Sequence, residues 1–124
     1  MRPDSLEART SGSFHPGIAA QIRAADALKR ELNELGAEPG SLLMHEQHVW
    51  ASATYAGVRH RLVYLFLGQE AVEHGLALIG EIPEHKFSIP HQLVADADVI
   101  NIDHCLTEPP RLELTLELLL LDEG

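Results

Sequence analysis

The sequence has a single cysteine, Cys105, so an intrachain disulfide cannot form. Its first thirty residues show no secretory signal pattern, and we therefore expect a cytoplasmic protein. Apolar runs such as Leu118 to Leu121 are far too short to cross a membrane. Paired cysteines with zinc-knuckle spacing, a GxxxxGK[ST] loop and a GxGxxG fingerprint are all missing. These absences argue against the most recognisable zinc, nucleotide and dinucleotide sites.

Basic residues are also scarce. The chain has 9 Lys+Arg against 19 Asp+Glu, a formal net charge of −10 with neutral histidines. Proteins that bind nucleic acid or anionic lipid rely on cationic side chains, so we expect neither partner. The 124 residues, 45% of them apolar, suit one globular domain.

The negative charge is concentrated in the second half of the chain. Residues 1–62 hold seven basic and seven acidic side chains. Residues 63–124 hold twelve acidic side chains against Lys86 and Arg111 only. Such an uneven distribution of charge influences which partners the protein binds and how it assembles.

Hydrophobic periodicity divides the chain into an N-terminal arm and one folded domain. Residues 1–16 are rich in Pro, Ser, Gly and charge, and we expect a flexible arm. Within the domain, 17–124, apolar residues recur at helical spacing or alternate as in strands. The pattern predicts helices over 17–35 and 69–82, and strands over 42–55, 58–67, 111–121 and part of 87–104.

The order helix-strand-strand, repeated, predicts an α+β fold. We expect a four-stranded, mainly antiparallel sheet with both helices on one face, in the manner of a circularly permuted ferredoxin-like plait. The two units, 17–67 and 69–121, also align in part: Gly36 and Pro39 match Gly80 and Pro83, each pair at the expected end of a helix. An internal duplication of a helix-strand-strand unit is the interpretation we favour.

The alternation of side chains assigns the strand residues to the two faces of the sheet. A turn at Ala56-Gly57 would direct Leu62, Tyr64 and Phe66 toward the helices. The same alternation places Val49, Ala51, Leu93, Ala95, Ala97 and Val99 on the helix-covered face. The opposite face, called the open face below, is expected to carry His48, Trp50, Arg59, Arg61, Val63, Leu65, Val94, Asp96, Asp98, Ile100, Glu113, Glu117, Leu119 and Leu121.

The apolar and charged side chains of the open face indicate how the protein functions. An apolar sheet face with segregated charges is commonly covered by another subunit, so we expect a homodimer acting as a binding or assembly module. The alternative is a small enzyme or ligand sensor that takes a small molecule on this face. The candidate ligand-binding residues are His48, Trp50, Arg59, Arg61, Asp96 and Asp98.

The eight histidines invite a metal hypothesis, chiefly at His45-Glu46-Gln47-His48. A helical HExxH motif places its histidines four residues apart on one face. Here they are three apart in an expected strand, which points them to opposite faces. We therefore expect no metal at this pair, and we identify no cofactor and no catalytic residue.

Overall fold

The computed structural model describes residues 16–123, so all but one residue of the expected arm lies outside the described part. Two helices and four strands follow one another in the order helix-strand-strand, helix-strand-strand. The helices are α1 (Pro16–Leu32) and α2 (Gln69–Glu81), extended by the π-turn η1 (Asn33–Ala37) and the 3₁₀ turn η2 (Ile82–Glu84). The strands are β1 (Ser41–Ala51), β2 (Ala56–Leu67), β3 (Gln92–Cys105) and β4 (Arg111–Asp122).

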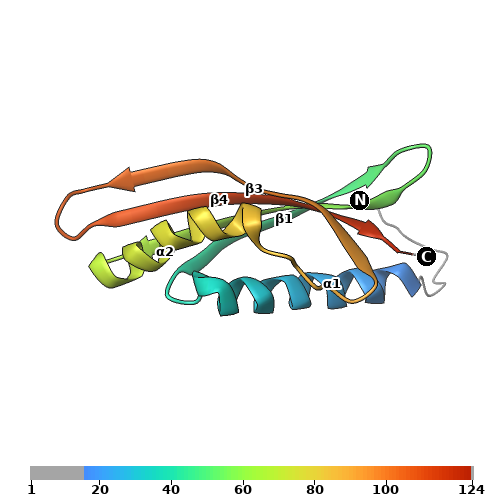
Figure 1. The fold of residues 1–124 in the computed structure, drawn as a ribbon, viewed down its shortest axis with the longest axis horizontal. Coiled ribbons are helices and arrows are strands. Elements are labelled where there is room, and N and C mark those ends of the chain that lie inside the picture. Colours follow the sequence, from blue (N-terminus) through green and yellow to red (C-terminus); the bar gives the residue numbers. More distant parts are fainter. Residues whose placement is uncertain (1–15, 124) are drawn as a thin grey trace.

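The strands form one antiparallel sheet in the order β1-β2-β4-β3. Both helices lie on the same side of it, and their buried side chains join a single core with β2 and β4 (Figure 1). The predicted α+β class, with two helices on one face of a four-stranded sheet, is confirmed. Neither helix of residues 16–123 is both long and apolar enough to cross a membrane.

Strand β4 supplies the centre of the core. It pairs along its whole length with β2 on one side and β3 on the other. Its even-numbered leucines point at the helices and are completely buried, while its odd-numbered side chains face the other way. The buried leucines are Leu112, Leu114, Leu116, Leu118 and Leu120.

Helix α1 ends where the sequence predicts. Gly36 adopts φ of +131°, a conformation that favours glycine, and turns the chain toward β1. Apolar residues at helical spacing, Ile18, Ile22, Leu28 and Leu32, form one stripe along α1, and Leu28 and Leu32 are fully buried. Ile18 and Ile22, at the start of the same stripe, remain more than half exposed because the first turns of α1 contribute little to the core.

The turn between β1 and β2 is longer than predicted. The loop consists of Ser52 to Tyr55, and its Ser52 Oγ accepts hydrogen bonds from the Thr54 and Tyr55 backbone N–H groups. Val49 consequently pairs with Val58, whereas a turn at Ala56-Gly57 would pair it with Tyr64. The pairing moves by an even number of residues, so each side chain keeps its predicted side of the sheet. Val49, expected beneath the helices, is nevertheless 85% exposed, so the helices do not cover this end of β1.

Strand β3 departs from the predicted alternation. Its pairing with β4 shifts between Val94 and Asp96 and again between Val99 and Asn101. Each irregularity inserts an extra residue, so Val94 packs against the core and was wrongly expected on the open face. Leu93, expected beneath the helices, pairs with the open-face Leu121 instead.

The internal duplication and the ferredoxin-like comparison remain predictions. The two glycines that support the duplication differ in conformation, because Gly36 has a positive φ and ends its helix. Gly80 lies inside α2, and it is not among the glycines with positive φ in residues 16–123. The shared Gly-Pro spacing therefore does not correspond to the same helix ending in both units.

Gly57 has a different role from the turn residue that the sequence suggests. A Cβ atom at Gly57 would lie 2.0 Å from the backbone oxygen of Leu120, on the neighbouring strand. We predict that Gly57→Ala lowers the free energy of unfolding by about 3 kcal/mol or more, since β2 or β4 must shift to admit a methyl group.

Gly80→Ala is the matched control, because a Cβ there meets no atom within 4 Å. In a helix this substitution stabilises by up to about 1 kcal/mol. Urea unfolding of both variants measures the difference. Equal stability of the two variants would contradict the assigned approach of β2 to β4.

Candidate functional site

Strand pairing arranges the open face in rows that run across all four strands. One row is charged and contains Asp98, Glu117, Arg61 and Glu46 in the order β3-β4-β2-β1. The next row contains Asp96, Leu119, Arg59 and His48, and a third, apolar row contains Leu93, Leu121, Gly57 and Trp50. All six predicted candidate residues thus lie on one face. Five of them lie in the first two rows, and Trp50 lies in the third.

Glu117 is the centre of the charged cluster. Its Oε2 accepts hydrogen bonds from Arg61 Nε at 3.2 Å and Nη2 at 2.9 Å, and its Oε1 accepts one from Arg59 Nη1 at 3.3 Å. These bonds lower the pKa of the Glu117 carboxyl, and the hydrogen bond from Arg61 has the largest effect. The arginine pair is therefore already held by a carboxylate, which sequence reasoning placed on this face without assigning it a role.

Asp96 and Asp98 form a separate acidic pair on β3. The negative charge of Asp96, followed by a hydrogen bond between the two carboxyls, raises the pKa of Asp98. Neither aspartate makes an ion pair with a basic side chain within residues 16–123. The pair carries mutual repulsion that a cationic group from outside would relieve.

His48 and Trp50 lie at the β1 side of the same face. The His48 ring Nε2 is 3.6 Å from Glu46 Oε1, and its side chain is largely exposed. Trp50 is half-buried, in the row in which Gly57 contributes no side chain. Carboxylates outnumber guanidinium groups among the charged residues here, so the arrangement does not favour a small anion.

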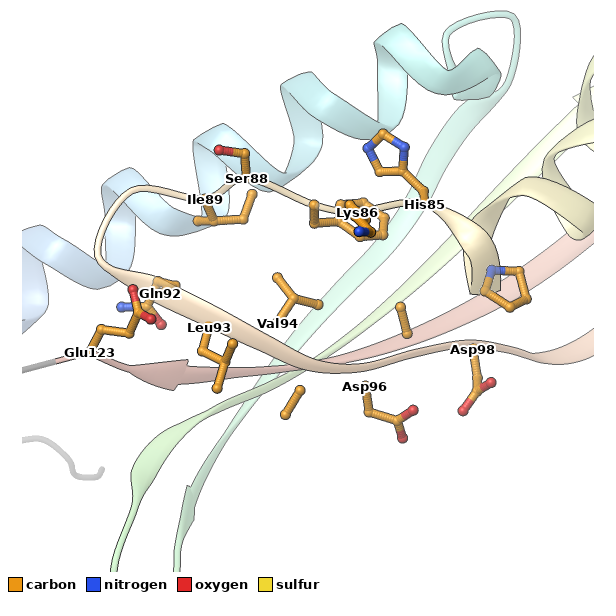
Figure 2. A pocket seen from close by; sticks show the side chains of 14 residues that line it. His85, Lys86, Ser88, Ile89, Gln92, Leu93, Val94, Asp96, Asp98 and Glu123 are labelled. Carbon is orange, nitrogen blue, oxygen red and sulfur yellow. The ribbon is translucent and has the colours of Figure 1, made fainter.

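A groove of about 680 Å³ lies between the segment Pro83–Ile89 and the first half of β3. The open-face residues that line it are Leu93, Asp96 and Asp98. In Figure 2 these two carboxylates point away from the segment, on the far side of β3, while His85 points toward α1. The polar groups around the groove diverge, which is not the convergent arrangement that catalysis needs.

His85 attaches that segment to α1. Its Nε2 is 2.6 Å from Glu31 Oε2, and the Ser88 backbone N–H donates to the same carboxylate at 3.2 Å. The Phe87 ring meets the His85 ring edge-on at 4.6 Å between centroids. We interpret this contact as structural, since it connects residues 54 positions apart and orders the entry to β3.

The other notable histidines form a pair beneath the sheet. His45 Nε2 and His60 Nδ1 lie 2.8 Å apart, and His60 is only 2% exposed. His45 thus faces the helices and His48 the open face, as the strand alternation predicts. Burial and the Lys29 ammonium lower the pKa of His45, so a cation is disfavoured beside the pair.

Within residues 16–123 there is no group of three or more His, Cys, Asp or Glu side chains arranged to hold a metal ion. Cys105 makes a hydrogen bond with Thr107 Oγ1, which lowers the pKa of its thiol. Comparison with known proteins adds no assignment: no protein-family model, curated protein or solved structure matches this chain.

The buried histidine pair makes the protein sensitive to acid. Burial, and then the neighbouring His45, lower the pKa of His60 from 6.5 to about 4. The unfolded chain therefore binds this proton at a higher pH than the folded chain. We predict that the free energy of unfolding keeps its full value above pH 6.5. It should fall by on the order of 3 kcal/mol as the pH drops toward 4.

His60→Leu removes the titrating group and is expected to flatten this pH dependence between pH 6.5 and 4. His104→Gln, at an exposed position on β3, is the control and should keep the wild-type slope. Chemical unfolding at a series of pH values measures both. A His60→Leu variant with the wild-type slope would show that the histidine pair is not responsible.

Proposed function

We propose that this protein is a homodimeric assembly module whose subunits meet through the open faces of their sheets. The observation that carries the proposal is the separation of charge on this face. Asp96 and Asp98, which make no ion pair with a basic side chain of residues 16–123, lie on β3, whereas Arg59 and Arg61 lie two strands away on β2. A face with both signs on opposite sides of a central strand is complementary to a second copy of itself.

A simple two-fold arrangement matches these charges row by row. If the axis runs along β4, then β3 of one subunit lies over β2 of the other. Residues of the same row then meet, because rotation about an axis parallel to the strands keeps their position along the strand. Asp98 would face Arg61 of the second copy, and Asp96 would face Arg59.

The apolar side chains of the open face suit the centre of such a contact. Leu119 and Leu121 of β4 lie on the axis and would meet their own counterparts. They are only 9% and 6% exposed in the single chain, so they add little area on their own. The proposal therefore depends mainly on electrostatic attraction, with half-buried Trp50 near the edge of the contact.

Charge reversal tests this pairing. Asp96→Lys/Asp98→Lys and Arg59→Glu/Arg61→Glu each place like charges opposite one another in a homodimer. We predict that each variant alone dimerises at least about tenfold more weakly than the wild type, equivalent to about 1.4 kcal/mol. An equimolar mixture of the two variants should regain dimers, because every facing pair is again of opposite sign.

Sedimentation velocity measures the dimer fraction, and circular dichroism verifies that both variants fold. Glu70→Lys/Glu73→Lys makes the same change of net charge as Asp96→Lys/Asp98→Lys, on the exposed side of α2, and should leave dimerisation unaltered. The proposal is wrong if the single variants dimerise like the wild type, or if mixing them restores nothing.

A further inference from the structure

The two edges of the sheet differ in how well they are protected against pairing with another strand. The β3 edge is interrupted by two irregularities and carries Asp96, Asp98 and Asp103. Irregularities and charges are the usual devices that prevent one sheet edge from joining another. The β1 edge is regular from Met44 to Ala51, and Glu46 is its single formally charged residue besides two histidines.

The β1 edge also exposes apolar side chains. Leu42, Leu43 and Met44 are 39%, 53% and 45% exposed, in a row at the start of the strand. The outer backbone N–H and C=O groups of an edge strand are free to pair with another strand. We propose that β1 pairs antiparallel with β1 of a second copy, so that two four-stranded sheets become one of eight strands.

Strand alternation limits the register of this pairing. Met44, Glu46, His48 and Trp50 face the open side, opposite Val63, Arg61, Arg59 and Gly57 of β2. In a continuous sheet, side chains that face each other across two strands lie on the same side. Only registers that pair even-numbered residues with even-numbered residues satisfy this condition.

Charge selects one register from the three nearest the middle of the strand. Centring on Glu46 places two glutamates opposite each other, and centring on His48 places two histidines opposite each other. Centring on Gln47 pairs Glu46 with His48 of the second copy at two equivalent positions. The same register pairs Met44 with Trp50, a favourable sulfur-aromatic contact.

This register uses the regular part of β1. The stretch from Met44 to Trp50 lies between the irregularity at Leu42/Met44 and the loop that begins at Ser52. Gln47 is the midpoint of that stretch and is exposed. The edge contact uses a surface different from the open face, so it stands independently of the function proposed above and is compatible with it.

Disulfide cross-linking tests the register. In a Cys105→Ser background, Gln47→Cys places two thiols opposite each other, within the Cα separation that a disulfide needs. Mild oxidation should convert most of the protein into a covalent dimer. Asn101→Cys, at an exposed position of the β3 edge, is the matched control and should cross-link at least about tenfold more slowly.

A charge exchange in the Gln47→Cys protein then tests the paired residues. His48→Glu sets two carboxylates against each other and should slow cross-linking about tenfold, whereas His104→Glu on β3 should not. Glu46→His/His48→Glu restores opposite partners in this register and should restore the rate. Cross-linking no faster than at Asn101, or a double exchange that fails to recover, overturns the proposal.

One further variant distinguishes the proposed β1 edge contact from the proposed open-face contact. Asp96→Lys/Asp98→Lys disrupts the open-face contact but lies at the other side of the sheet from β1. Cross-linking at position 47 should persist in that background. Its loss would show that position 47 reports the open-face contact, and the edge proposal would then be wrong.

Discussion

The structure depends on the burial of one face of β4. Five leucines at alternate positions of this strand are fully removed from solvent, and β4 lies between β2 and β3. Burying a leucine side chain is worth about 1.5–3 kcal/mol. Because neighbouring side chains of a strand point to opposite faces, this burial also directs Glu113, Glu117, Leu119 and Leu121 to the open face. Core and candidate interface are two consequences of the same alternation.

The same alternation explains why the prediction of the faces was correct where the prediction of the turn was not. The helices, strands and open-face arginines follow from hydrophobic periodicity, which is a property of each segment. The loop from Ser52 to Tyr55 depends on local hydrogen bonds to Ser52, and Gly57 is required by the backbone of β4. The irregularities of β3 likewise depend on its fit to β4, so its alternation failed at Val94.

The candidate site was predictable in its residues and less so in its contacts. The six candidate residues lie on one face, but the carboxylate that holds both arginines belongs to a strand distant in the sequence. The pairing of His45 with His60 was predictable from the sequence, because the strand alternation directs both side chains toward the helices. The contact of Glu31 with His85 leaves no periodic signal, because it joins a helix to an irregular segment.

The unequal distribution of charge along the chain has a spatial counterpart. The formal charge of −10 comes entirely from residues 63–124, which supply β3 and β4, while the neutral first half supplies the arginines of β2. On the open face this difference becomes an acidic side and a basic side. We propose that these two sides attract a second copy of the chain.

Sedimentation velocity of the wild-type protein at micromolar concentration, in low and in high salt, measures this attraction. We expect reversible self-association that weakens as salt screens the charges of the open face. A protein that remains monomeric at both ionic strengths would contradict it.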